Sequence, residues 1–201
     1  MIGPSIVIAL TGLAGSGKST VADRLTAMYG FRREKFAGPL KDMMRAFGLS
    51  EDEIEGDRKE VSSDLLCGAT PRHAMRTLGT EWGRMLIHPD LWASAWRRRA
   101  STGRVVADDC RFLNEATAVR TLGGTIVRIE RPGLAAAAHV SEQEMSGIVP
   151  DETIVNDGSP ADLARKVDEL VSRLLARPSA AVATHAELAT NLPARPVILE
   201  T

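Results

Sequence analysis

The fold of this chain is decided by the stretch Gly12-Leu13-Ala14-Gly15-Ser16-Gly17-Lys18-Ser19. It matches the pattern of a glycine, four residues and then Gly-Lys-Ser, in which a glycine-rich loop cradles phosphate groups. A short apolar run, Ser5 to Leu10, precedes it and is typical of a strand buried on both faces. A helical pattern follows from Lys18 to about Tyr29. Strand, glycine loop and helix in this order predict a phosphate-binding P-loop.

Each side chain of the loop has an expected task. The backbone N–H groups converge on phosphate oxygens, and the helix N-terminus adds a favourable dipole. Lys18 is expected to bridge the β- and γ-phosphates, Ser19 to offer its hydroxyl to Mg²⁺, and Thr20 to support the α-phosphate side. The expected cofactors are therefore ATP and Mg²⁺, bound by Gly12, Ala14, Gly15, Ser16, Gly17, Lys18, Ser19 and Thr20. The motif alone does not say how the nucleotide is used, because motors, switches and kinases share it.

Further strands are expected at Arg104 to Ala107, Thr125 to Ile129 and Thr153 to Val155. They alternate with helical patterns, which favours an α/β fold with a parallel sheet. The middle of the chain, from about Lys41 to Ala100, is mostly helical in pattern.

The last helix has clear boundary chemistry, with Ser159 at the cap, Pro160 in the first turn and Asp162 three residues after the cap. Its end is marked by Arg177 and Pro178. The residues beyond are rich in Ala, Thr and Pro without clean periodicity. We therefore expect one domain over residues 1–177 and a tail over residues 178–201.

The bulk composition restricts the partners. The 201 residues include 25 Lys and Arg against 26 Asp and Glu, so the formal net charge of -1 provides no field that would attract DNA or an anionic membrane. The N-terminal apolar run is too short for a signal peptide or a membrane span. Cys67 and Cys110 lack metal-ligand spacing and are expected to be reduced thiols. These features favour a cytoplasmic protein with a small-molecule substrate; a homodimer is left open.

A second polar segment follows the strand at Arg104 to Ala107. Asp108, Asp109 and Arg111 fall at the carboxyl end of that strand, where open α/β sheets bind ligands. One interpretation is that an aspartate holds Mg²⁺ through water. The alternative is that the aspartates cap the following helix and pair with Arg111.

At this point the chain resembles the bacteriophage deoxynucleoside monophosphate kinases. The likeness runs in order from residue 5 to about 176, and its most specific blocks are LGTEWGR and DxRFxNEA. The family often carries Asp where this chain has Gly38, which is a departure from the pattern. The segments that carry the likeness are Phe36 to Lys41, Thr70 to Arg72, Leu78 to Arg84, Pro89 to Trp92, Asp109 to Ala116, Arg128 to Gly133, His139 to Glu142 and Asn156 to Gly158.

The resemblance implies an adenylate-kinase-like, three-layer α/β/α P-loop fold. It would have a core, a helical acceptor-binding region at about 38–101 and a mobile lid over ATP at about 131–145. The sequence supplies the corresponding side chains. A nucleotide phosphate in a closed cleft needs cationic donors, and a solvated basic face is the alternative for each of them. The candidates for binding the acceptor are Lys41, Arg72, Arg76, Arg84 and Arg111, with Trp82 either stacking on a base or lying in the core.

The expected lid follows a strand and opens with Pro132-Gly133, which suits a hinge. Arg128 and Arg131 could swing onto the transferring phosphoryl group. Asn156 and Gly158 fall where the resemblance places adenine contacts, and a simple turn is their alternative.

The expected reaction is ATP + dNMP giving ADP + dNDP, for phage DNA precursor supply in the host cytoplasm. No strong general base is needed, because the second pKa of a phosphate monoester is about 6. The expected catalytic residues are Lys18, Asp109, Arg111 and Arg131, and the expected metal-binding residues are Ser19, Asp108 and Asp109. Two alternatives stay open: a kinase for another acceptor, such as a phosphomevalonate-like isoprenoid precursor or a hydroxymethylated base in DNA, and an ATP-dependent switch or motor.

Overall fold

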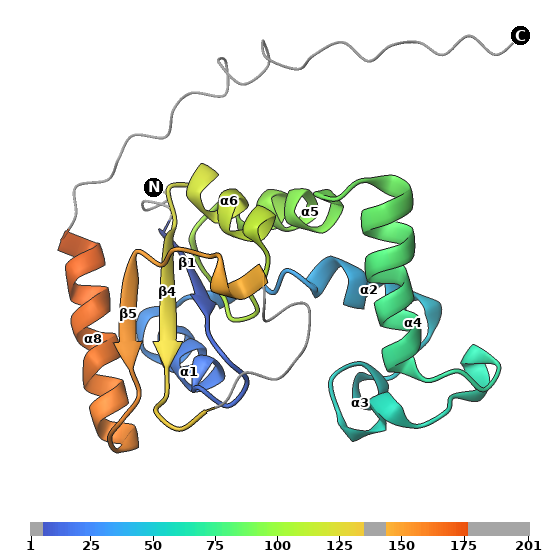
Figure 1. The fold of residues 1–201 in the computed structure, drawn as a ribbon, viewed down its shortest axis with the longest axis horizontal. Coiled ribbons are helices and arrows are strands. Elements are labelled where there is room, and N and C mark those ends of the chain that lie inside the picture. Colours follow the sequence, from blue (N-terminus) through green and yellow to red (C-terminus); the bar gives the residue numbers. More distant parts are fainter. Residues whose placement is uncertain (1–5, 135–143, 177–201) are drawn as a thin grey trace, which may run out of the picture.

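A five-stranded, all-parallel sheet forms the centre of the computed structural model, which describes residues 6–134 and 144–176 (Figure 1). The strand order is β2-β3-β1-β4-β5, and every neighbouring pair is parallel. The P-loop strand therefore lies in the middle of the sheet. The strands are β1 (Ile6–Thr11), β2 (Arg32–Arg33), β3 (Arg104–Ala107), β4 (Thr125–Glu130) and β5 (Glu152–Val155).

Helices cover both faces of this sheet. Successive side chains of β1 point to opposite faces and are apolar on both, so both faces must be covered. Ile8 and Leu10 belong to one buried cluster, together with side chains of α1 (Lys18–Tyr29) and α8 (Pro160–Ala176). Val7 and Ala9 belong to the other cluster, on the opposite face. That second cluster includes side chains of α5 (Leu91–Ala100) and α6 (Leu113–Thr121). The expected three-layer α/β/α fold is confirmed.

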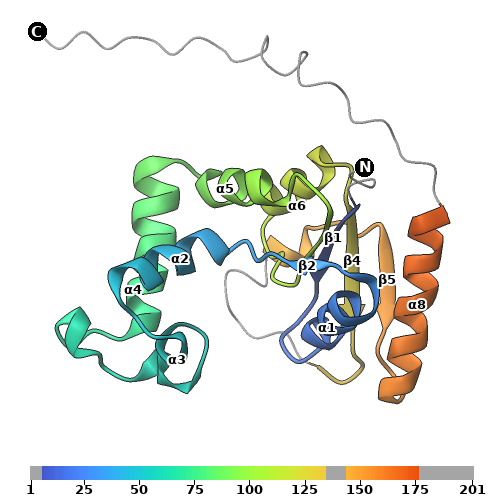
Figure 2. The same cartoon turned by 180° about the vertical axis from the view of Figure 1, so that it is seen from behind.

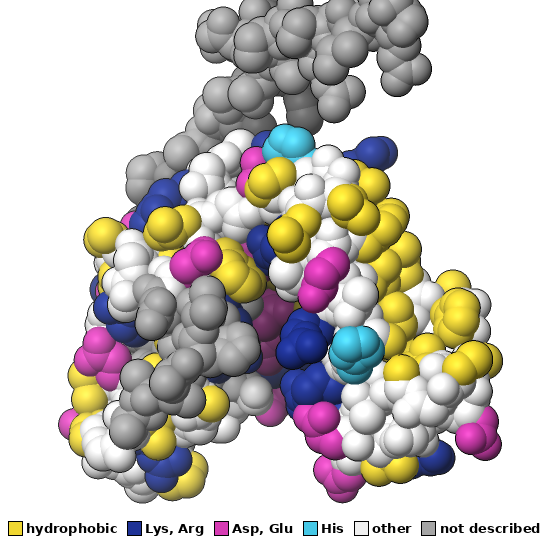
Figure 3. Space-filling view, turned by 45° about the vertical axis from the view of Figure 1, so that its right-hand side comes forward, with side chains coloured by type: hydrophobic (Ala, Val, Ile, Leu, Met, Phe, Trp, Pro, Cys, Tyr) yellow, Lys and Arg dark blue, Asp and Glu magenta, His cyan; other side chains and the backbone are white. Residues whose placement is uncertain are grey.

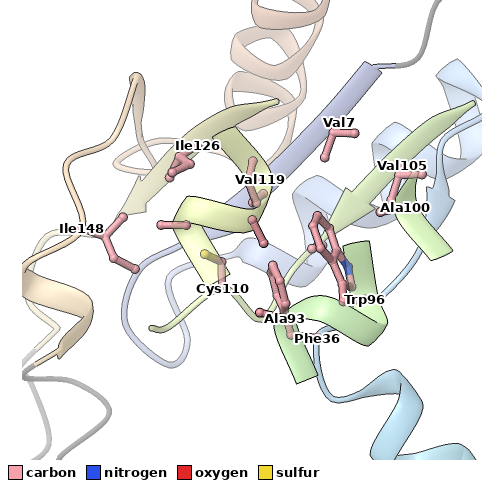
Figure 4. Close-up of a cluster of buried hydrophobic side chains, with 14 residues drawn as sticks. Val7, Phe36, Ala93, Trp96, Ala100, Val105, Cys110, Val119, Ile126 and Ile148 are labelled. Atoms are coloured by element: carbon pink, nitrogen blue, oxygen red, sulfur yellow. The ribbon is translucent and has the colours of Figure 1, made fainter. Parts of the chain in front are cut away.

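The second cluster also joins the sheet to the helical middle of the chain. Figure 4 shows Trp96 of α5 beside Phe36, whose ring centroid lies 4.1 Å from that of Trp96. Trp96 Nε1 donates a hydrogen bond to Glu34 O at 2.9 Å. This packing anchors the segment that leaves β2.

The residues between β2 and β3 form a helical arm, as expected. Figures 1 and 2 show α2, α3 and α4 beside the sheet layers rather than over a face of the sheet. The arm begins with α2, whose first residue is Gly38. Its elements before α5 are α2 (Gly38–Phe47), α3 (Glu51–Ile54), the 3₁₀ turns η1 (Asp57–Glu60) and η2 (Asp64–Leu66), α4 (Pro71–Thr77) and the π-helix η3 (Leu78–Ile87).

The boundary chemistry of α8 agrees with expectation. Asp162 N donates to Ser159 Oγ at 3.2 Å, and Ser159 N donates to Asp162 Oδ2 at 3.0 Å, so the two residues satisfy each other's amides. Within the described residues, no helix is long and apolar enough to span a membrane. The central part of the expected lid, residues 135–143, and the expected tail from residue 178 lie outside the described residues.

Candidate active site

The P-loop joins β1 to α1 through a backbone that only glycine fits at two positions. Gly12 has φ +133°, and a Cβ atom there would lie 2.2 Å from Ile129 O. Gly17 has φ +108°, and its Cβ would lie 2.7 Å from Asn156 Nδ2. Positive φ and close approach both exclude other side chains. Asn156 Nδ2 also donates to Ser16 O at 2.9 Å, which ties the end of β5 to the loop.

Polar side chains of the loop are held ready for an anion. Lys18 Nζ donates to Gly12 O at 2.6 Å and to Leu13 O at 2.7 Å. Ser16 is fully buried, and its Oγ has no hydrogen-bond partner among the described residues. A buried hydroxyl without a partner is rare, because it has lost its water. The loop therefore fits a polar ligand.

The P-loop opens onto two clefts. The larger has a volume of about 860 Å³ and lies between the core and the helical arm; the smaller has about 410 Å³ and lies beside the start of α8. Gly15, Lys18 and Ser19 line both clefts. Figure 3 shows the molecule hollowed between two lobes, with Lys, Arg and acidic side chains gathered in the hollow. The loop therefore stands at the junction of two binding spaces.

Most of the residues predicted from the sequence line these clefts. Those in the larger cleft are Ala14, Gly15, Lys18, Ser19, Lys41, Arg72, Arg76, Arg84, Asp108, Asp109 and Arg111. Those in the smaller cleft are Gly15, Gly17, Lys18, Ser19, Thr20, Arg131, Asn156 and Gly158.

Four predicted residues line neither cleft: Gly12 and Ser16, which belong to the P-loop itself, and Trp82 and Arg128, which come from other elements. Trp82 is 38% exposed, and its ring lies 6.2 Å from that of Trp92, which does line the larger cleft. Arg128 donates to Ile148 O. Its neighbours in β4, Val127 and Ile129, belong to the cluster on the α1 face, so the Arg128 side chain leaves the sheet on the opposite face. The structure does not bring the Trp82 and Arg128 side chains to the P-loop.

The basic wall of the larger cleft contains paired and unpaired cations. Glu55 lies 2.6 Å from Lys41, 3.8 Å from Lys35 and 4.0 Å from Lys59, measured between carboxylate oxygen and Nζ. Arg72 pairs with Glu60. By contrast, the Arg76 and Arg111 guanidinium groups make no hydrogen bond or ion pair with any residue that the structure describes. Those two are available to an incoming anion.

The two aspartates after β3 have different surroundings. Asp108 is 8% exposed; its Oδ2 lies 3.2 Å from Arg33 Nη2, and its Oδ1 is buried without a partner among the described residues. Asp109 instead accepts hydrogen bonds from Phe36 N at 2.8 Å and Ala37 N at 3.1 Å, at the start of α2. Desolvation, with a contribution from the charge of Asp108, raises the pKa of Asp109 above its ordinary value despite these bonds.

The alternative role considered for these aspartates, capping the following helix and pairing with Arg111, is wrong. Glu115 binds the amides of Arg111 and Phe112, just before α6, and Asp109 binds the amides of Phe36 and Ala37, just before the more distant α2. Asp108 pairs with Arg33, which sequence reasoning missed. Arg33 Nη2 also donates to Ser19 O at 2.9 Å, so this arginine connects the end of β3 to the first turn of α1.

Glu115 is the second functional residue that sequence reasoning missed. It is 3% exposed and lines the larger cleft. Its Oε2 accepts from Arg111 N at 2.8 Å and Phe112 N at 3.1 Å, and its Oε1 accepts from Arg84 Nη2 at 3.2 Å. Burial, and then the charge of Asp109, raise the pKa of Glu115 to about 7. Its position in the DxRFxNEA block was the available signal.

The central P-loop strand, the two helical layers and the loop at the junction of two clefts define a nucleotide-binding P-loop protein, and its similarity to a known kinase makes it a phosphotransferase. No family model matches the chain. The chain is 32% identical over 189 residues to the "Putative deoxynucleotide monophosphate kinase" of Acanthamoeba polyphaga mimivirus, covering 85% of this chain and 94% of that protein. It therefore belongs to the deoxynucleotide monophosphate kinase family.

Among solved structures, the chain is similar to TT1252 and to a shikimate kinase. TT1252 from Thermus thermophilus is 22% identical with a TM-score of 0.49, over 85% of this chain and 98% of that one. Shikimate kinase from Aquifex aeolicus is 16% identical with a TM-score of 0.48, over 85% and 99% of the two chains. Both scores are below 0.5, so the family assignment rests on the mimivirus relative and the fold on the chain's own topology.

Proposed function

We propose that this protein transfers the γ-phosphoryl group of ATP to a deoxynucleoside 5'-monophosphate, giving ADP and a deoxynucleoside diphosphate. The observation that carries the proposal is that Gly15, Lys18 and Ser19 line both clefts. Two nucleotides in those clefts would meet end to end at the P-loop, as in-line transfer requires. The name of the mimivirus relative supports a monophosphate as acceptor.

The smaller cleft is the proposed site for the adenine nucleotide. Asn156 and Gly158 line it beside the P-loop, and Arg131 lies at its edge on the segment after β4. The P-loop amides would bind the phosphates, and Lys18 would stabilise charge on the transferring group. Residues 131–145 are the proposed lid, whose closure would exclude water that could hydrolyse ATP.

Ser19 and Asp108 are the proposed residues for Mg²⁺. The buried Asp108 Oδ1 lacks a partner among the described residues, which suits an oxygen that faces a hydrated cation. Both oxygens of Asp109 already bind the amides of Phe36 and Ala37, just before α2, so we assign Asp109 to holding the start of α2 in place and not to the metal. When bound, Mg²⁺ neutralises charge on the β- and γ-phosphates.

The larger cleft is the proposed acceptor site. Arg76 and Arg111 are available for the monophosphate, while Lys41, Arg72 and Arg84 line the same wall in ion pairs with carboxylates. Phe36, Trp92 and Phe112 line this cleft, whereas the predicted Trp82 does not. An ionised acceptor phosphate attacks without a general base, so catalysis consists of positioning and charge neutralisation. Residues 1–177 would form this one kinase domain.

An ADP-release assay across all deoxy- and ribonucleoside monophosphates, with ATP and Mg²⁺, tests the proposal. We expect at least one deoxynucleoside monophosphate to stimulate ADP release strongly over the rate without acceptor. A phosphorylated isoprenoid precursor and DNA with hydroxymethylated bases serve as competing acceptors. Stimulation by one of these alone, or by a macromolecule without phosphoryl transfer, would overturn the proposal. That such diphosphates supply DNA precursors for a phage, in a host cytoplasm, stays a prediction.

A further inference from the structure

Glu115 occupies an unusual place in the larger cleft, because it links the helical arm to the core. Arg84, one of its partners, belongs to the π-helix η3 of the arm. Its other partners are the backbone amides of Arg111 and Phe112, in the loop between β3 and α6. One carboxylate therefore holds two walls of the cleft in a fixed relation.

The same loop constrains Arg84 from a second direction. The Arg84 guanidinium carbon lies 4.1 Å from the centroid of the Phe112 ring. A guanidinium held by a carboxylate and stacked on a ring has lost most of its rotational freedom. The Arg84 side chain is 22% exposed and lines the cleft, so part of it remains accessible to a ligand.

A third contact joins the same two parts of the molecule. Asn114 Nδ2 donates to Pro89 O and to Asp90 Oδ1, each at 3.0 Å, at the connection between η3 and α5. The N-terminus of α6 is thus attached to the end of η3 independently of Glu115. Losing the Glu115 carboxylate should therefore loosen Arg84 without detaching the arm.

We infer that Glu115 is a positioning residue for the acceptor. It holds Arg84 against Phe112 and fixes the conformation of the loop that carries Arg111, so that both guanidinium groups face one nucleotide phosphate. This inference rests on the proposed function, since it takes the larger cleft to be the acceptor site. Glu115 does not touch the phosphate itself, because its oxygens are already bound by Arg84 and by the two loop amides. Its effect must therefore pass through Arg84 and the loop.

The test compares Glu115→Gln, Arg84→Met and the double variant in the full-length chain. We expect Glu115→Gln to raise KM for the preferred deoxynucleoside monophosphate at least tenfold, with KM for ATP within about twofold of wild type. The double variant should lose less than the sum of the two single defects, because part of the effect of Glu115 passes through Arg84. Additive defects, or equal rises in both KM values, would overturn the inference.

Glu115→Asp provides a second variant if Glu115→Gln does not fold. The side chain is one methylene shorter, so it keeps its charge near the loop amides but falls short of Arg84. We expect the melting temperature to stay near that of wild type and the acceptor KM to rise. A wild-type acceptor KM in Glu115→Asp would contradict the inference.

Asp168→Asn is the matched control. Asp168 accepts two hydrogen bonds from Arg24, at 2.7 and 2.5 Å, on the α1–α8 face of the sheet, and lines neither cleft. Losing this ion pair should leave both KM values unchanged.

Failure of the proposed function can be told apart from failure of this inference. If wild type phosphorylates no monophosphate, calorimetric binding of inorganic phosphate replaces KM as the measurement. The inference then predicts that Glu115→Gln and Arg84→Met each weaken phosphate binding at least fivefold, and that the double variant loses less than the sum of the two single losses. Unchanged phosphate affinity in Glu115→Gln would overturn it.

Discussion

Gly83 lies directly against the indole ring of Trp92: a Cβ atom on Gly83 would be 2.6 Å from Trp92 Nε1. The same Nε1 donates to Gly79 O at 2.8 Å, so Trp92 crosses η3 at its two glycines. His88 N donates to Gly83 O, five residues earlier, as π-helical bonding requires. The glycines of the LGTEWGR block therefore serve the packing of a tryptophan that lines the larger cleft.

Gly83→Ala tests this relationship. In an ordinary helix the change to Ala gains about 0.8–1.0 kcal/mol in propensity. Here we expect a net loss of up to about 2 kcal/mol, because overpacking typically costs about 1–3 kcal/mol and outweighs the gain in propensity. Gly79→Ala is the control, because its Cβ would meet the terminal Cδ1 of Leu40 at 3.0 Å rather than a ring. Thermal unfolding of both variants measures the difference, and equal melting temperatures would refute the packing argument.

Lys18→Ala should leave a folded protein that has lost most of its phosphoryl transfer. We expect kcat to fall by about 100- to 1,000-fold or more, because a cation is removed where charge develops. The variant also loses two hydrogen bonds to Gly12 O and Leu13 O, so a small fall in melting temperature is expected. Arg165→Ala, which loses an exposed i,i+4 pair with Glu169, controls for loss of a cation. Turnover near wild type in Lys18→Ala would remove the P-loop from the mechanism.

Stability should depend on pH through Glu115. Its pKa is raised from an ordinary value of 4.5 to about 7, so ionisation is less favourable in the folded chain than in the unfolded one. The stability that the protonated carboxyl contributes is complete below pH 4.5 and is lost as pH rises through 7. A difference of this size corresponds to about 3 kcal/mol.

Glu115→Gln cannot ionise, so its stability should fall less than that of wild type across this range. Two charged groups act on Glu115: Asp109, which raises its pKa, and Arg84, which lowers it. Urea unfolding of both proteins between pH 5 and 8 measures the effect. We expect the free energy of unfolding of wild type, relative to the variant, to decrease with pH. Parallel pH profiles would show that the Glu115 carboxyl does not titrate in this range.

The sequence predicted the parts of the fold that local patterns encode. The P-loop, the strands around it and the cap at Ser159 each rest on residues within one element or one turn, and all were confirmed. By contrast, β2 is two residues long, too short to show alternation. The π-helix was expected only as a helix, because the apolar pattern of a sequence does not distinguish bonding to the fifth preceding residue from bonding to the fourth.

The cationic residues of the site were predicted by type, but their partners were not. Arg33 reaches Asp108 across 75 positions of sequence, and Arg84 reaches Glu115 across 31. Such pairs depend on the register of the sheet and the direction of the arm, and no local pattern encodes them. Trp82 shows the converse, since its place in a specific motif suggested a base contact, while the structure puts Trp92 and Phe112 in the cleft.

Arg111 is the predicted phosphate ligand that the structure makes easiest to test. Had Arg111 held Asp108 and Asp109 in place, removing it would have lowered stability and activity together. Arg33 and the amides of Phe36 and Ala37 hold those aspartates instead. The Arg111 side chain is exposed and makes no hydrogen bond or ion pair within residues 6–134 and 144–176, so Arg111→Ala should keep the melting temperature of wild type.

The activity of Arg111→Ala, unlike its stability, should fall well below that of wild type. Losing a guanidinium that pairs with a phosphate in a desolvated site costs about 2–5 kcal/mol, whereas losing a solvated surface charge costs about 0–1 kcal/mol. Arg111→Lys keeps the charge but not the planar fork, so most of the defect should persist if the contact is bidentate. Steady-state kinetics toward the best monophosphate measures both variants, with Arg165→Ala as the control for an exposed arginine outside the clefts. A stable Arg111→Ala variant whose kcat/KM falls less than about fivefold would show that Arg111 does not bind the acceptor phosphate, because the loss would then match that of a surface charge.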